Sequence, residues 1–138
     1  MSSSNAFQFP VRVYWEDTDA GGIVFYANYL KFFERARTEW LRALGISQSS
    51  LRETSGGMFV VSETSVRYLR AARLDDELLV TARLQEAGRA SLIIAQQALQ
   101  KSGGALLSEA TIRIGWVDAA SLQPGRIPPI ILESLKQT

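Results

Sequence analysis

Acidic side chains and glycines gather in one short segment, residues 16–22, directly ahead of a long amphipathic stretch. Asp17 and Asp19 are its two aspartates, and Gly21 and Gly22 close it. A helix exposes unpaired N–H groups and the positive end of its dipole at its first turn. A carboxylate beside such donors suits acyl transfer, which needs a base or nucleophile and N–H groups aimed at a developing oxyanion. The segment is therefore the first candidate for chemistry.

The same residues also fit a purely structural role, which the pattern by itself favours. Aspartates commonly cap helices and form turns, and Asp17 and Asp19 precede a helix. Glu16 and Asp17 are most simply turn residues that shape the local electric field. Composition and spacing alone do not identify a thioester as the substrate.

The composition removes most other kinds of catalytic site. The 138 residues include no histidine and no cysteine. A Ser-His-Asp triad, a Cys-His pair and the commonest zinc ligands are therefore excluded. Acid–base chemistry must come from carboxylates, lysine, tyrosine or backbone dipoles. We expect no metal, because residues 16–19 alone make a poor cage for a tightly held ion.

Charge and hydropathy indicate a soluble protein. The net charge of +1 gives no basis for binding nucleic acid. No apolar run is long enough to cross a bilayer, and the polar start lacks the basic and apolar parts of a signal peptide. We therefore expect a cytoplasmic protein with no membrane insertion.

A helix must position the acidic segment. Apolar residues recur at three- and four-residue steps, which predicts an amphipathic helix over residues 24–44 with a broad buried face. Gly45 stands where a left-handed C-terminal cap belongs. The residues that form this stripe are Tyr29, Phe33, Ala36, Trp40 and Leu44.

Alternating apolar and polar residues predict strands over residues 7–15, 60–68, 78–85, 91–100 and 106–116. The last four are joined by short turns, which favours antiparallel neighbours. Between the long helix and these strands we expect a short helical turn and a loop, and near the end a short final helix. The fold class is therefore α+β, with one helix against one antiparallel five-stranded sheet in a single domain, residues 1–138.

Three stretches resemble one known family. The first is V-R-V-Y-W-E-D-T-D-A-G-G-I-V-F-Y-A-N-Y-L-K-F-F-E-R-A-R-T-E-W-L-R, residues 11–42. The second is V-R-Y-L-R-A-A-R-L-D-D-E-L, residues 66–78, and the third is V-D, residues 117–118. In this order they are similar to the YbgC-type and 4-hydroxybenzoyl-CoA thioesterases. The resemblance implies a hotdog fold, in which an antiparallel five-stranded sheet wraps around one long central helix.

The resemblance also implies an activity and a site. The substrate would be an acyl-CoA with a short-chain aliphatic or aromatic, 4-hydroxybenzoyl-like acyl group, so CoA is part of the substrate and no cofactor is implied. Asp19, the second aspartate of the family's D-x-D-x-x-G, would be the nucleophile or general base. The backbone N–H of Tyr26 would polarise the carbonyl. Gly22, Arg89 and Ser91 would bind substrate, with Arg89 near the nucleotide of CoA.

Tyr26 departs from the YbgC-type members, which usually carry histidine there, and agrees with the 4-hydroxybenzoyl-CoA thioesterases. Two other functions compete. A hotdog hydratase or dehydratase usually employs a histidine, which this chain lacks. A non-catalytic protein that binds acyl-CoA or acyl carrier protein, or a scaffold associated with the cell envelope, is the second. The intact Asp19 argues for catalysis.

A single sheet layer with one helix leaves edge strands and one sheet face open. We therefore expect a homodimer or a homotetramer built as a dimer of dimers. The run of residues 92–95 is apolar on both faces, which predicts that the second face is partly covered. Hotdog proteins pair their sheets edge to edge, and their active sites lie between subunits.

Overall fold

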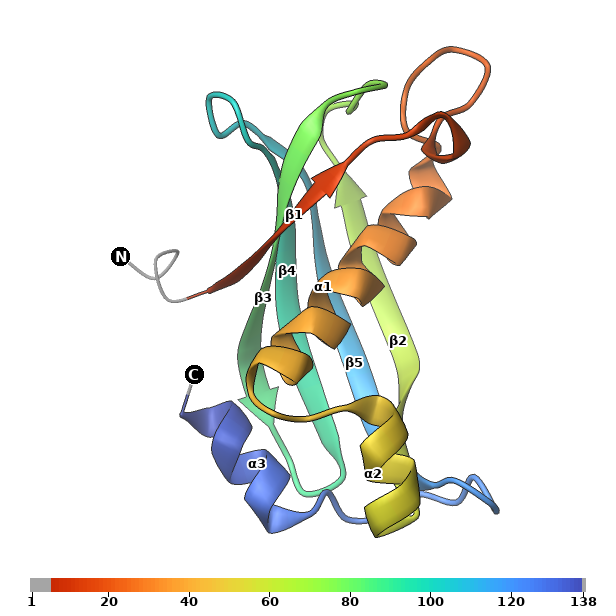
Figure 1. The fold of residues 1–138 in the computed structure, drawn as a ribbon, viewed down its shortest axis with the longest axis vertical. Helices are drawn as coiled ribbons and strands as arrows, with labels where there is room; N and C mark the ends of the chain where they lie inside the picture. Colours follow the sequence, from red (N-terminus) through yellow and green to blue (C-terminus); the bar gives the residue numbers. More distant parts are fainter. Residues whose placement is uncertain (1–5, 138) are drawn as a thin grey trace.

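The computed structural model describes residues 6–137, and one antiparallel sheet wraps around one long helix in it (Figure 1). The predicted hotdog architecture is thereby confirmed. The strands lie in the order β1-β3-β4-β5-β2, and every neighbouring pair is antiparallel. They are β1 (Phe7–Arg12), β2 (Gly57–Tyr68), β3 (Glu77–Ala87), β4 (Ser91–Gln100) and β5 (Leu106–Asp118).

The alternation of buried and less buried residues along each strand shows which face of the sheet meets the helix. In β4, Leu92, Ile94, Gln96 and Ala98 are buried, while the residues between them are only half-buried. Bulges interrupt the register in β2, β3 and β5. Because a bulge bends its strand and increases the local twist, these interruptions help the sheet to curve around the helix.

The long helix α1 (Tyr29–Ala43) begins later than residue 24, where the sequence pattern places its start. Val24 and Phe25 are held outside the helix because their N–H groups bond to the carbonyls of Ala72 (2.9 Å) and Asp17 (3.0 Å). The 3₁₀ turn η3 (Tyr26–Asn28) then leads into α1. The helix buries Tyr29, Phe32, Phe33, Ala36, Trp40 and Leu41.

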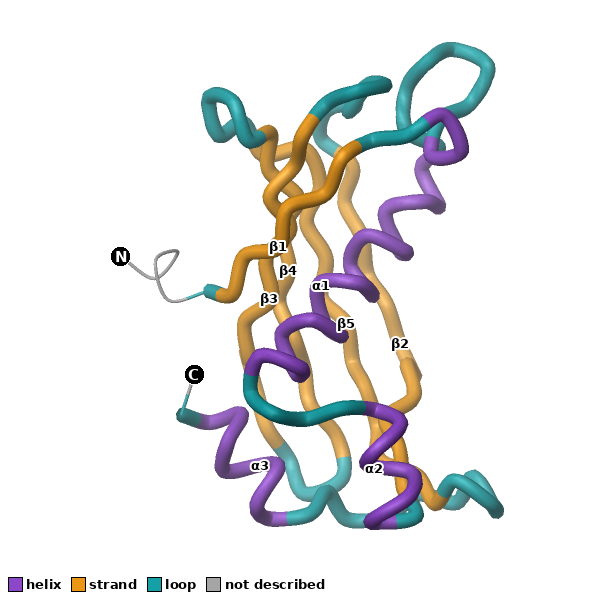
Figure 2. The backbone as a smooth tube through the Cα atoms, viewed as in Figure 1, coloured by secondary structure: helices purple, strands orange, loops and turns teal. Residues whose placement is uncertain are grey.

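Two other regions also differ from the prediction, the end of the first strand and the segment between α1 and β2. The first strand ends at Arg12 because the N–H of Val13 bonds to the carbonyl of Asp76, and the chain then forms the 3₁₀ turn η2 (Trp15–Asp17). A regular helix, α2 (Gln48–Ser55), replaces the expected turn and loop, and β2 begins directly after it. The expected final helix is α3 (Pro129–Lys136). Figure 2 shows α2 and α3 at the end of the sheet opposite the loop that precedes α1.

Gln96 anchors the helix to the sheet from within the core. Its side chain is 1% exposed, and its Nε2 donates to the carbonyls of Phe33 on α1 and Thr81 on β3, both at 3.0 Å. Its Oε1 accepts a hydrogen bond from Arg37 (2.9 Å). Because a buried amide is costly unless its groups are paired, this arrangement fixes α1 against β3 and β4.

Candidate active site

The loop ahead of α1 folds back on itself. Thr18 and Val24 form a β-bridge, and the N–H of Asp19 bonds to the carbonyl of Ile23 at 2.9 Å. Gly22 turns the chain with a φ of +77°, and its N–H bonds to the carbonyl of Asp19 at 3.0 Å. A side chain would strain this backbone conformation, so a glycine suits the position. The loop is thus a compact turn. It pairs Asp19 with Ile23, which precedes Tyr26 by three residues.

Asp17 holds this loop to the start of the helix. Its side chain is 3% exposed, and each carboxylate oxygen accepts one hydrogen bond. Oδ1 accepts from the amide of Asn28 at 2.8 Å, and Oδ2 accepts from the N–H of Tyr14 at 2.9 Å. Asn28 itself is buried and immediately precedes α1. The structural role that the sequence favours for Asp17 is therefore the one its contacts support.

Asp19 has a different environment, although it is only two residues away. Its side chain is exposed, and its Oδ1 accepts the N–H of Gly21 at 2.8 Å. Within residues 6–137 its other oxygen, Oδ2, has no hydrogen-bond or ion-pair partner. This carboxylate is therefore free to meet a ligand, whereas that of Asp17 is fully engaged.

Unpaired backbone donors lie at the start of the helix. The first hydrogen bonds of this region come from the N–H groups of Asn28, to Phe25, and Tyr29, to Tyr26. The N–H groups of Tyr26 and Ala27 consequently donate to no acceptor in the described part of the chain. Such donors, at the positive end of a helix, suit an oxygen that becomes negative.

An aromatic wall stands beside these donors. The ring of Tyr26 lies 4.8 Å from that of Phe25 and 6.0 Å from that of Tyr68, and Tyr68 lies 5.6 Å from Tyr29. Burial raises the pKa of Tyr68, and the neighbouring Tyr26 raises it further. Burial also raises the pKa of Tyr29, although its hydroxyl accepts the N–H of Ala72 (3.2 Å). Tyr29 and Tyr68 therefore remain protonated at neutral pH and cannot serve as bases.

Arg89 lies in the turn between β3 and β4, and Ser91 begins β4. This turn is at the opposite end of the sheet from the loop ahead of α1, which holds Asp19 (Figure 1). The 11 residues of β3 separate the two ends, which corresponds to about 33 Å. Within one chain, the predicted catalytic and nucleotide-binding residues therefore do not meet. The N–H of Ile127 bonds to the carbonyl of Arg89 (2.8 Å) and brings Arg126 beside it. Sequence reasoning missed Arg126, because the two arginines are distant along the chain and only the fold brings their backbones together.

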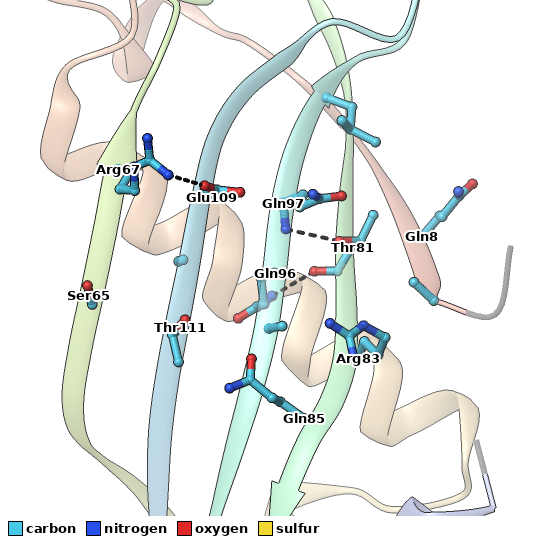
Figure 3. A pocket seen from close by; sticks show the side chains of 14 residues that line it. Gln8, Ser65, Arg67, Thr81, Arg83, Gln85, Gln96, Gln97, Glu109 and Thr111 are labelled. Atoms are coloured by element: carbon cyan, nitrogen blue, oxygen red, sulfur yellow. Dashed lines mark hydrogen bonds and ion pairs between the residues drawn. The ribbon is translucent and has the colours of Figure 1, made fainter. Parts of the chain in front are cut away.

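The outer face of the sheet carries a broad polar hollow of about 440 Å³ (Figure 3). Its side chains come from all five strands or the residue before β1, and they include an ion pair between Arg67 and Glu109 at 2.9 Å. Asp19 and Tyr26 do not line it. This hollow is therefore separate from the candidate active site.

The described residues contain neither an acidic metal cluster nor a helix that could cross a membrane. No three acidic side chains there converge as a metal site would require. Among the helices of the same part of the chain, none is long and apolar enough to span a membrane.

Fold and loop together define a class: a hotdog-fold enzyme with a free carboxylate ahead of its central helix. Residues 13–135 match the thioesterase-like superfamily. The acyl-CoA thioesterase YbgC of Haemophilus influenzae is 44% identical over 124 residues, 90% of each chain. The acyl-CoA thioester hydrolase YbgC of Escherichia coli is 39% identical over 135 residues, 98% of this chain and 99% of that one.

A solved structure also resembles this chain in both sequence and fold. A probable thioesterase from Bartonella henselae is 32% identical and has a TM-score of 0.84, over 89% of this chain and 99% of that one. The chain belongs to the thioesterase-like superfamily, and it is a thioester hydrolase. The family resemblance in the sequence is confirmed.

The contacts of Asp17 lead to a prediction about stability. We expect Asp17→Ala to lower the free energy of unfolding by about 1–3 kcal/mol, because it leaves the N–H of Tyr14 and the amide of Asn28 without an acceptor. Asp19→Ala is the matched control, and we expect it to change stability by no more than about 0.5 kcal/mol, since its side chain is exposed. Urea unfolding of both variants measures the difference. Equal stabilities would contradict the assigned role of Asp17.

Proposed function

We propose that this protein hydrolyses acyl-CoA thioesters with a short-chain aliphatic or aromatic acyl group at the loop ahead of α1. The observation that carries the proposal is the exposed carboxylate of Asp19, with one oxygen unengaged, close in the chain to the free N–H of Tyr26. The names of the two YbgC relatives support acyl-CoA as the substrate.

In this mechanism the thioester carbonyl accepts a hydrogen bond from the N–H of Tyr26, which stabilises the negative charge that develops on its oxygen. Asp19 then acts in one of two ways. It attacks the carbonyl carbon and forms an anhydride that water hydrolyses, or it takes a proton from a water that attacks directly. Either route breaks the C–S bond and releases CoA and the free acid. The fixed bond from Gly21 to Oδ1 of Asp19 restrains the carboxylate for this task.

We propose further that two copies pair through the open edge of β2, which in the described chain is hydrogen-bonded only to β5. Antiparallel pairing about a two-fold axis places the far end of one sheet beside the near end of the other. Arg89 and Arg126 of the second copy then approach the site of Asp19, where they suit the phosphates of CoA. Gly22 and Ser91 remain predicted substrate contacts, and a cytoplasmic location, a tetramer and an acyl carrier protein partner remain predictions.

Asp19→Asn tests the reaction itself. We expect it to reduce kcat for an acyl-CoA by at least about a thousandfold with an unchanged thermal melt, because the amide is a poor base and nucleophile. Asp17→Asn should affect kcat much less in the folded protein. An active Asp19→Asn variant would overturn the assignment of this residue. A wild-type protein that binds acyl-CoA or acyl carrier protein without turnover would favour the non-catalytic alternative.

Two substitutions of Tyr26 distinguish the role of its backbone N–H from the role of its ring. We expect Tyr26→Phe to retain kcat/KM within about tenfold, a transition-state change of about 1.4 kcal/mol or less, because the N–H remains and only the hydroxyl is lost. Tyr26→Pro should be far worse, since it removes the N–H. Circular dichroism checks that the proline variant still folds. A loss beyond about a hundredfold in a stable Tyr26→Phe variant would place the phenol in the mechanism.

If each active site draws residues from both subunits, two subunits with different defects should complement each other. We expect an Asp19→Asn chain and an Arg89→Ala, Arg126→Ala chain to be weakly active alone. Co-expressed, they should recover about a quarter of the wild-type sites, because half of random dimers are mixed and each mixed dimer has one intact site. Light scattering gives the oligomeric mass. A stable, fully active monomer, or a mixture no more active than its components, would contradict the proposed pairing.

A further inference from the structure

The connection between β2 and β3, residues 69–76, lies against the loop ahead of α1 (Figure 1). The N–H of Val24 in that loop bonds to the carbonyl of Ala72 at 2.9 Å. Beside this bond, Ile23 and Arg73 form an antiparallel β-bridge. The half of the loop that leads into the helix is therefore paired with a segment that lies far from it in the sequence.

The side chain of Tyr29, the first residue of α1, holds the same connection from the helix. Its hydroxyl accepts the N–H of Ala72 at 3.2 Å, although the two residues are 43 positions apart. Tyr29, Ala72 and Val24 are 3%, 0% and 4% exposed. Because water does not reach this place, an Ala72 that lost the hydroxyl would keep a buried N–H without an acceptor.

Ala72 thus fixes both ends of the segment that carries the free backbone donors. Its carbonyl holds Val24 and its N–H holds Tyr29, so residues 24–29 are closed into a ring by two hydrogen bonds to one residue. The two unpaired N–H groups at the start of the helix lie inside this segment. A segment fixed at both ends has less conformational freedom than one fixed at a single end, so the ring restricts where these donors point.

The same contacts reach Asp19. Its N–H bonds at 2.9 Å to the carbonyl of Ile23, the neighbour of Val24. A displacement of Ala72 would therefore move Val24 and, through Ile23, would move Asp19 relative to the N–H of Tyr26. The rate of a reaction between positioned groups depends steeply on such alignment, and a misplacement of about 1 Å can lower it by about a hundredfold.

We propose that Tyr29 is a positioning residue: its hydroxyl fixes Ala72, and Ala72 sets the geometry of the N–H of Tyr26 relative to the carboxylate of Asp19. This rests on the proposed function and adds to it a residue that acts through Ala72 rather than on the thioester.

Tyr29→Phe removes the hydroxyl and keeps the ring that packs in the core. We expect kcat for butanoyl- and benzoyl-CoA to fall by about tenfold with KM within about twofold, because alignment in the transition state is lost while the binding surface remains. The matched control is Thr81→Val on β3, since the hydroxyl of Thr81 accepts the N–H of Gln97 at 3.0 Å in the separate outer-face hollow. This variant also loses a side-chain acceptor for a backbone N–H, yet its kcat should stay within about twofold of the wild type.

Amide hydrogen exchange, followed by NMR, tests the same link without turnover. In Tyr29→Phe the amides of Val24 and Asp19 should exchange at least about fivefold faster relative to that of Gln97, because the local opening of the loop becomes easier. In Thr81→Val the amide of Gln97 should exchange faster relative to the other two. Thermal melts establish that both variants are folded.

A folded Tyr29→Phe variant with wild-type kcat, with a loss mainly in KM, or with unchanged exchange at Val24 and Asp19 overturns the proposal, as does an equal loss of kcat in Thr81→Val. If Tyr29→Phe does not fold, the wild type decides. Protection of the Ala72, Val24 and Asp19 amides within about tenfold of one another supports a single unit, and a wider spread contradicts it. Failure of the proposed function is distinct, because the wild type then hydrolyses neither thioester, and the exchange rates still show whether Tyr29 positions the loop.

Discussion

The carboxylate of Asp17 is buried between the N–H of Tyr14 and the amide of Asn28, and these two bonds fix the loop against the start of α1. Asp17 also accepts the N–H of Phe25 through its backbone carbonyl, which keeps that residue out of the helix. The turn η3 and its unpaired N–H groups exist because the helix cannot extend further toward its N-terminus. The buried and fully hydrogen-bonded carboxylate of Asp17 thus orders the loop in which one carboxylate oxygen of Asp19 remains unengaged.

The core provides the second fixed point. Gln96 joins α1 to β3 through carbonyls on both, so the helix cannot slide along the sheet without breaking bonds to a side chain that water does not reach. Such a slide would leave buried polar groups unpaired, at a cost of about 1–3 kcal/mol each. The loop is fixed to the helix and the helix to the sheet, so the free N–H groups have a defined position relative to β2. That chain of contacts gives a small protein without disulfides or histidine an ordered site.

Much of this architecture follows from the sequence. Alternation predicts the strands, and the apolar stripe from Tyr29 to Leu44 predicts which face of α1 is buried. The motif around Asp19 indicates the site. Local pattern could not separate the environments of Asp17 and Asp19, because that difference arises when the loop folds over Asn28. Nor could it place the start of α1, which depends on a bond from Val24 to the distant Ala72.

The hydrogen bonds of Asp17 all join residues between positions 14 and 28, whereas a small hollow of about 150 Å³ between α1 and β2 is assembled from α1 and three strands. The loop and this hollow are therefore encoded in separate parts of the chain. In evolutionary terms, substitutions at Val61 or Ile114 can reshape the hollow without disturbing the bonds that hold the loop. Lineages built on this plan can change the shape of this hollow while the loop that holds Asp19 stays under unaltered selection.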